Sequence, residues 1–211
     1  MYLPKHFEQT DPAALISLMA AHPLATLVSL RAPGLTADHI PLEYDSAAHC
    51  LRGHVARANP LWREAAGQNL LAIFQGPQSY ISPNLYPSKA QTHKVVPTWN
   101  YAVVHVHGPL QVVEDAPWLH ALVSRLTDHH ERSQPDAWAV GDAPAEYVQQ
   151  MLRAIVGIEI PVQSWLGKFK LSQNRSQADR EGVIRGLAQS HAEAQSVASA
   201  MSDVEASAPK E

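Results

Sequence analysis

The stretch 99–113, WNYAVVHVHGPLQVV, carries the longest strand signal of this 211-residue chain. Side chains alternate between two faces of an extended segment, so its small and aliphatic residues separate from its histidines. One face would carry Ala102, Val104, Val106 and Gly108, and the other Val103, His105 and His107. The segment is long enough to span the wall of a barrel, which favours a fold built mainly of strands.

Shorter runs on both sides of this segment predict further strands and a few helices. An N-cap at Asp11 before Pro12 and helical spacing of Leu15, Leu18 and Met19 predict a helix that opens the fold. Asn59-Pro60 predicts a second helix, up to residue 66. Further strands are expected at 25–30, 39–44, 51–56, 70–74, from about Tyr80, 156–160 and 165–171, and helices at 116–132, 144–154 and 177–187.

Many short strands around few helices predict a mainly β fold with helices (α+β), a small β-barrel with helical elaborations. An open α+β sandwich is the alternative. We expect one domain over residues 1–189. Residues 190–211 are mostly Ala, Ser, Glu and Gln, with too little apolar surface to offset the entropy of ordering, so they are expected to form a disordered tail.

Composition narrows the class of protein. Apolar residues make up 45% of the chain, and no apolar run reaches the roughly 18–20 residues that cross a bilayer, so no membrane association is expected. No signal peptide is visible at the N-terminus, which favours the cytoplasm. Cys50 is the only cysteine and excludes an internal disulfide. The net charge of −4 disfavours direct DNA binding, although a dimer can still carry a local basic patch.

Polar residues gather in four segments that could bind a ligand. Arg57 and Asn59, between a strand and a helix, could hold an anion; alternatively Arg57 pairs with a carboxylate and Asn59 only caps the helix. The other three are the Pro-rich loop 75–89, a polar and aromatic stretch at 95–101, and 167–175, which puts Lys168 and Lys170 on one face of an extended segment. Each of these segments also has a reading without a ligand. The loop 75–89 could be an ordinary turn, the aromatic residues of 95–101 could pack in the core or a dimer interface, and 167–175 could be a solvated edge strand.

The histidines raise the question of a metal site. His105 and His107 share a strand face, and His129-His130 adds a second pair, but no pattern fixes three or four converging ligands. We therefore predict no metal and place these side chains at an interface or a cavity. No Gly-x-Gly-x-x-Gly, phosphate-binding P-loop, Gly-x-Ser-x-Gly or His-Glu-x-x-His motif occurs.

Six segments together resemble one family, the FMN-binding negative transcriptional regulators represented by PaiB. In order they are MYLPKHF (1–7), GHVARANP (53–60), YISP (80–83), YPSK (86–89), VPTWNY (96–101) and KFKLSQN (168–174). The resemblance covers about residues 1–187. It implies an FMN-binding split β-barrel related to pyridoxamine-phosphate oxidase, in a homodimer with FMN at or near the subunit interface.

The resemblance also implies roles for individual residues. Arg57 and Lys89 would bind the FMN phosphate, with Ser82 and Ser88 assisting. The ring system would meet Thr98, Trp99 and Asn100. His54, Val55 and Asn59 would shape the same pocket, and Lys170 and Gln173 would close it, from either subunit. The chain departs from the family at Leu85, near which the family favours an aromatic residue. A leucine there would loosen the stacking over the flavin or widen the pocket, and either change would alter FMN affinity.

Two functions follow from the resemblance. The first is a negative transcriptional regulator whose FMN senses redox state or a ligand, although no helix-turn-helix is visible in the sequence. The second is an FMN-dependent flavin reductase or oxidoreductase that acts on a small molecule. A flavin store or interaction module without turnover is the third reading.

Overall fold

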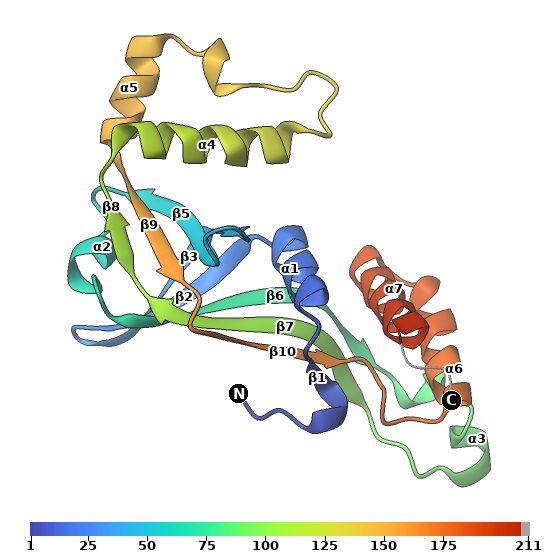
Figure 1. Cartoon of the computed structure of the whole chain (residues 1–211). Helices are drawn as coiled ribbons and strands as arrows, with labels where there is room; N and C mark the ends of the chain where they lie inside the picture. Colours follow the sequence, from blue (N-terminus) through green and yellow to red (C-terminus); the bar gives the residue numbers. More distant parts are fainter. Residues whose placement is uncertain (208–211) are drawn as a thin grey trace. The chain divides into compact units, whose positions relative to one another are not determined.

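The computed structural model describes residues 1–207, whose helices and strands are labelled in Figure 1. They divide into two compact units. Each unit is assembled from separate segments of the chain. Unit 1 comprises Met1–Leu18, Gln75–Val104 and the described residues from Leu166 onward, and unit 2 comprises Met19–Phe74 and His105–Trp165. The strands β6 (Asn69–Ile81) and β7 (Thr98–Pro109) run from one unit into the other.

Unit 2 holds most of the short strands. β2 (Leu24–Arg31) pairs with β3 (Gly34–Pro41) over its whole length and with β6 on its other edge. A second sheet has the order β4-β5-β9-β8, and all its pairs are antiparallel. The elements of this sheet and the helices of the unit are β4 (Glu43–Asp45), β5 (Cys50–Ala56), β8 (Gln111–Val113), β9 (Ile155–Pro161), α2 (Leu61–Glu64), α4 (Ala116–Glu131), η3 (Val140–Asp142) and α5 (Ala145–Arg153).

Unit 1 combines strands in the order β1-β10-β7-β6 with helices from both ends of the chain. β1 pairs with β10 in antiparallel register, Glu8 opposite Lys168. The elements are η1 (Lys5–Phe7), β1 (Glu8–Gln9), α1 (Pro12–Ala21, which ends in unit 2), η2 (Pro83–Leu85), α3 (Lys89–Thr92), β10 (Ser164–Lys170), α6 (Gln177–Ala188) and α7 (Ala192–Ser207).

The predicted alternation along β7 is confirmed. Ala102, Val104, Val106 and Gly108 are all buried, and Val103 on the opposite face is buried as well. The predicted helices at the start of the fold, at 116–132, at 144–154 and at 177–187 are present with ends shifted by a few residues at most. The α+β fold class with antiparallel sheets is therefore confirmed.

The prediction of a break before Tyr80 is wrong, because β6 continues unbroken from Asn69 to Ile81. The Gly76-Pro77 pair reads as a turn in the sequence. A Cβ at Gly76 would lie 2.9 Å from Leu18 Cδ1 and 3.0 Å from the Ala102 oxygen, so this glycine permits close packing inside the strand. The predicted helix at 60–66 is also shorter, since α2 ends at Glu64.

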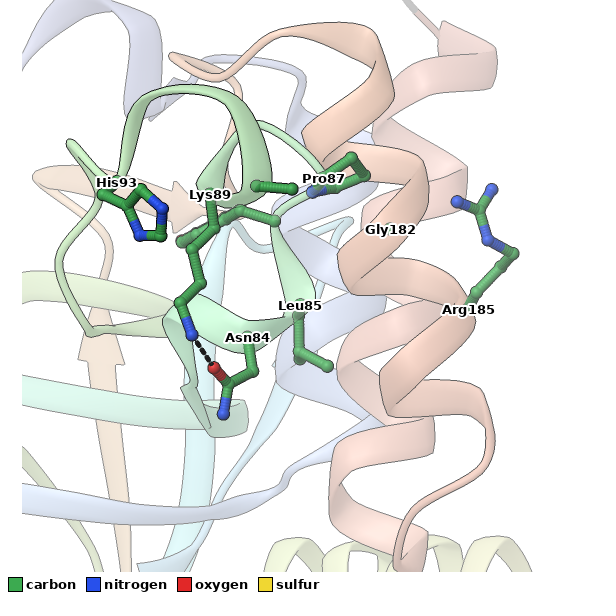
Figure 2. Close-up of a pocket in the computed structure, with 9 residues that line it drawn as sticks. Asn84, Leu85, Pro87, Lys89, His93, Gly182 and Arg185 are labelled. Carbon is green, nitrogen blue, oxygen red and sulfur yellow. Dashed lines mark hydrogen bonds between the residues drawn. The ribbon is translucent and has the colours of Figure 1, made fainter.

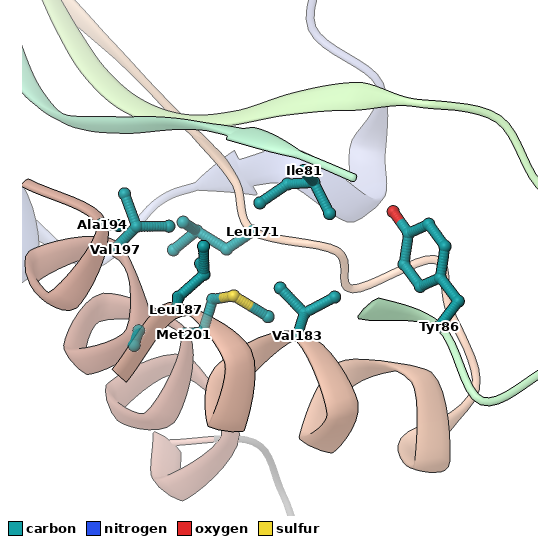
Figure 3. Close-up of a cluster of buried hydrophobic side chains, with 9 residues drawn as sticks. Ile81, Tyr86, Leu171, Val183, Leu187, Ala194, Val197 and Met201 are labelled. Carbon is teal, nitrogen blue, oxygen red and sulfur yellow. The ribbon is translucent and has the colours of Figure 1, made fainter. Parts of the chain in front are cut away.

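The prediction of a disordered tail is wrong for residues 192–207, which form the helix α7; residues 208–211 lie outside the described part of the chain. Its apolar side chains look sparse in sequence, yet Ala194, Val197, Ala198 and Met201 share one face at helical spacing and are buried. They belong to a cluster that includes Ile81, Leu171, Val183 and Leu187 (Figure 3). Small alanines let α7 lie close against its neighbours.

The prediction of one domain over residues 1–189 stays a prediction. The two compact units interleave in sequence, and β6 and β7 belong to both. Within residues 1–207, no helix is both long and apolar enough to span a membrane.

Candidate functional site

The loop that carries η2 and α3 borders a hollow of about 580 Å³ in unit 1, closed on one side by α6. Lys89 begins α3 and His93 follows its last residue, and both side chains line this hollow. Figure 2 shows the Lys89 ammonium donating to the Asn84 side-chain oxygen. Arg185 also lines the hollow, but its side chain extends from α6 away from Lys89. Its guanidinium Nη1 lies 3.8 Å from the Glu181 Oε2.

The charge on Lys89 makes this hollow a candidate anion site. Within residues 1–207, the Lys89 ammonium has no carboxylate partner, and its one hydrogen bond goes to a neutral amide. An ammonium without a counterion attracts a phosphate and forms charge-assisted hydrogen bonds with it. The role of Lys89 at the FMN phosphate stays a prediction.

The two serines predicted beside Lys89 serve to shape the loop. Ser82 Oγ accepts from the Asn84 N–H and caps η2. Ser88 donates both its backbone N–H, at 3.0 Å, and its hydroxyl, at 2.8 Å, to the buried Asp179 of α6. The Ser88 hydroxyl proton is thus committed to a carboxylate.

Asp179 was missed by the sequence analysis. Burial raises the pKa of the Asp179 carboxyl, but the hydrogen bonds from Ser88 and Ser176 lower this pKa by a larger amount. The net shift of the pKa is therefore downward. The anion is therefore the stable form at neutral pH. No local signal singles out Asp179, because its partner Ser88 lies 91 positions earlier. His93 was also missed, although its i, i+4 relation to Lys89 could have identified it.

A second hollow of unit 1, of about 470 Å³, has aromatic side chains in its wall. Tyr80 and Trp99 are in edge-to-face contact, with ring centroids 6.2 Å apart, and Trp99 is 53% exposed. Leu85 lines both this hollow and the one beside Lys89. An exposed indole offers the flat apolar surface that a planar ring requires.

Lys170 joins the predicted ring contacts. Its ammonium donates to Thr98 Oγ1 at 2.6 Å and to the Trp99 backbone oxygen. Burial lowers the pKa of Lys170, and the neighbouring positive charges of Lys168 and Arg175 lower it further. Three cations thus lie near one another in unit 1, which favours binding of an anion there.

Asn100 and Gln173 do not line either hollow. Asn100 is fully buried, and its amide exchanges hydrogen bonds with the Ser172 hydroxyl and contacts Met201 Sδ at 3.4 Å. Gln173 accepts from the Leu171 N–H and donates to the Phe169 oxygen, within its own turn. Both side chains therefore stabilise the backbone around the candidate site through hydrogen bonds.

The four remaining predicted residues, His54, Val55, Arg57 and Asn59, lie in unit 2 at the end of β5 and beyond it. Arg57 donates to Glu114 at 2.6 Å and to the backbone oxygens of Arg153 and Ile155. Asn59 Oδ1 accepts from the Leu61 N–H, and its Nδ2 donates to Asp38. These contacts match the alternative reading of this segment, an ion pair and a helix cap.

The buried imidazole of His54 has an unusual environment. Its Nδ1 is buried without a hydrogen-bond partner in the described structure, and burial lowers the pKa of the ring. Val55 is buried in the core. Within residues 1–207, no group of three or more His, Cys, Asp or Glu side chains is arranged to hold a metal ion.

Comparisons with known proteins define the class. Residues 1–164 match the family model described as "Putative FMN-binding domain". The "Protease synthase and sporulation protein PAI 2" of Bacillus subtilis is 31% identical over 191 residues, which are 89% of each chain. An uncharacterized protein of Emericella nidulans is 32% identical over 226 aligned positions, covering 89% of this chain and 90% of that protein.

Solved structures share the fold. The FAD and heme binding protein of Mycobacterium smegmatis aligns with a TM-score of 0.61 at 17% identity, over 85% of this chain and 80% of that one. The flavocytochrome Anf3 of Azotobacter vinelandii has the same TM-score at 10% identity, over 80% of this chain and 72% of that one. These likenesses show that the chain shares its fold with the two proteins. The chain belongs to the FMN-binding domain family that includes PAI 2.

Proposed function

We propose that this protein binds FMN and that Lys89 contacts the phosphate. The supporting observation is the ammonium of Lys89, which borders a hollow and has no carboxylate partner within residues 1–207. A phosphate dianion would supply the missing counter-charge. His93 lies on the same hollow and would add a ring N–H donor.

Arg57 is a second candidate for the phosphate. Its side chain is 37% exposed and that of its partner Glu114 is 53% exposed. An ion pair this open to solvent contributes little free energy, so a dianion can displace Glu114 at small cost. Asn59 and His54 belong to this set as predicted neighbours, and Val55 supports the strand that carries them.

The ring system is proposed to lie beside Trp99, where the second hollow offers an aromatic wall. Thr98 and Lys170 form a hydrogen-bonded pair next to this tryptophan and would supply polar contacts to the ring edge. Ser82, Ser88, Asn100 and Gln173 would act through the loop and turn that they hold in place.

A paired titration tests which cation contacts the phosphate. FMN and riboflavin differ only by that phosphate. Lys89→Ala should therefore weaken FMN binding about 10- to 100-fold, which corresponds to about 1.4 to 2.7 kcal/mol for one charge-assisted hydrogen bond, and leave riboflavin binding unchanged. Arg57→Ala is measured in the same way. Lys94→Ala is the matched control, because Lys94 is an exposed lysine of the same loop.

Each result has a distinct meaning. Equal losses for FMN and riboflavin in Lys89→Ala would show that Lys89 supports the loop and does not touch the phosphate. If both Lys89→Ala and Arg57→Ala bind FMN normally, the phosphate lies elsewhere. Failure of the unaltered protein to bind FMN at micromolar concentration would contradict the proposal itself.

For the biological role we propose a cytoplasmic homodimeric regulator that represses transcription, in which FMN senses redox state or a ligand. The support is the relationship to PAI 2, whose name links that protein to protease synthesis and sporulation. Binding to DNA should then be sequence-specific and weaken steeply with salt.

The alternative is an FMN-dependent reductase, favoured by the exposure of Trp99, which leaves the aromatic hollow open to a second substrate. Steady oxidation of NADH or NADPH that requires FMN would support the enzyme.

A further inference from the structure

Unit 2 contains an apolar cavity of about 300 Å³ that shares no lining residue with either hollow of unit 1. The helices α4 and α5 and the turn η3 form its walls, together with the facing ends of β5 and β9; Figure 1 shows α4 and α5 together at the end of these strands. Of the residues predicted to bind FMN, only His54 lines this cavity.

A glycine lies opposite His54 in the sheet that carries the cavity. His54 pairs with Gly157 in the ladder between β5 and β9. A Cβ at position 157 would lie 2.4 Å from Trp118 Cζ3, so α4 lies directly against the sheet there. Beside this contact point, the helix and the strands enclose the cavity next to the imidazole.

The wall chemistry excludes a charged ligand. Among residues 1–207, no Asp, Glu, Lys or Arg lines the cavity, and its wall includes aliphatic side chains such as Val123, Val148 and Leu152. A phosphate or carboxylate would lose its hydration there without gaining a counterion. The cavity therefore offers no counterion to the phosphate of FMN or of a nicotinamide nucleotide, in contrast to the hollow beside Lys89.

The polar side chains of the wall are His54, Thr127, Tyr147 and Trp138, and of these His54 has a buried atom without a hydrogen-bond partner. The Nδ1 of His54 is buried and has no hydrogen-bond partner. The Nε2 also makes no hydrogen bond within residues 1–207, but it is not buried. Nε2 is therefore the nitrogen that a ligand can reach. Burial lowers the pKa of His54, which keeps the ring neutral. A buried N–H without an acceptor is rarer in proteins than an unused acceptor, so the proton belongs on Nε2. The ring then offers a ligand one donor.

The aromatic residues at the opening suit a flat molecule. Trp138 is 49% and Tyr147 54% exposed, although both line the cavity, and Met151 beside them is 40% exposed. Exposed aromatic and methionine side chains grouped at a cavity are typical of ligand-binding surfaces. The volume is about twice that of an engineered cavity of about 150 Å³ that binds benzene. Two fused rings therefore match the space.

We propose that this cavity binds a small, uncharged bicyclic aromatic molecule whose carbonyl oxygen accepts a hydrogen bond from His54 Nε2. This goes beyond FMN binding and does not depend on it. The cavity would serve either role considered for the protein, as the ligand pocket of a regulator or as the substrate pocket of a reductase.

Coumarin is a suitable probe, because it is an uncharged bicyclic molecule with a carbonyl oxygen, and naphthalene is its match without that oxygen. Calorimetric titration of the full chain should give coumarin a dissociation constant below about 1 mM. His54→Leu should weaken coumarin binding about three- to tenfold, the worth of one hydrogen bond, and leave naphthalene binding unchanged. Saturating FMN should not displace coumarin.

Filling the cavity provides an independent test. Val148→Trp should abolish binding of both probes, whereas Gln149→Trp, on the exposed side of α5, should leave both unchanged. Circular dichroism and thermal unfolding check that each variant is folded. The proposal is overturned if coumarin does not bind, if FMN displaces it, if Val148→Trp still binds it, or if His54→Leu weakens both probes equally.

Discussion

The helix α7 should contribute strongly to stability, and Met201→Ala measures how much. Met201 is 2% exposed, packs in the cluster of α6 and α7, and contacts Asn100 Nδ2 at 3.4 Å (Figure 3). Truncation of a buried methionine to alanine costs about 2–5 kcal/mol, from lost burial and the cavity left behind. For a chain of this length, about 3 kcal/mol corresponds to a fall in Tm of roughly 6–12 °C.

The assay is urea unfolding followed by circular dichroism, with thermal unfolding as a second measure. Ser199→Ala is the matched control, since Ser199 lies on the exposed face of the same helix; its free energy of unfolding should change by less than about 0.5 kcal/mol. A loss below about 0.5 kcal/mol for Met201→Ala would refute the reasoning, because it would mean that α7 does not pack on α6 in solution.

Two further predictions concern the frame around the sites. Gly157→Ala should destabilise unit 2 by about 1–3 kcal/mol, because the new Cβ would press on Trp118, whereas Gly34→Ala, with no atom within 4 Å of its Cβ, should be nearly neutral in the same urea titration. The lowered pKa of Asp179 contributes stability that is complete above its unfolded value near 3.9 and is lost as pH falls through the lower folded pKa. Acid unfolding below about pH 4 should therefore remove more stability from the native protein than from Asp179→Asn; equal pH profiles would contradict the assignment.

Local sequence patterns predicted most of the fold because the signals are periodic. Alternation along β7 and the cap at Asp11 depend on neighbouring residues, and both are present in the structure. The errors arose where a tertiary contact reversed a local preference. The sequence indicates a turn at Gly76, but this glycine lets β6 continue and pack closely. The composition of the last residues indicates a disordered tail, but α7 buries its alanines in the core.

Long-range polar pairs could not be predicted from the sequence. Ser88 and Asp179 are 91 positions apart, and Asn100 and Ser172 are 72 positions apart. No spacing rule connects residues at such separations, so Asp179 was not identified and Asn100 was assigned to the ring when it is fully buried. The resemblance to a family located the segments, but the direction of each side chain depends on the tertiary packing.

The position of Lys89 depends on residues outside the region matched to the family model, which ends at residue 164. Asp179 of α6 holds Ser88 by two hydrogen bonds, and Ser88 directly precedes Lys89. A Cβ at Gly182 would lie 2.4 Å from the Leu85 oxygen, and one at Gly186 2.5 Å from Leu85 Cδ2, so the same helix also fixes the residue that lines both hollows. Because α6 packs in turn on α7, a cut before residue 177 should release the Lys89 loop, and FMN affinity should fall even though the matched region is intact.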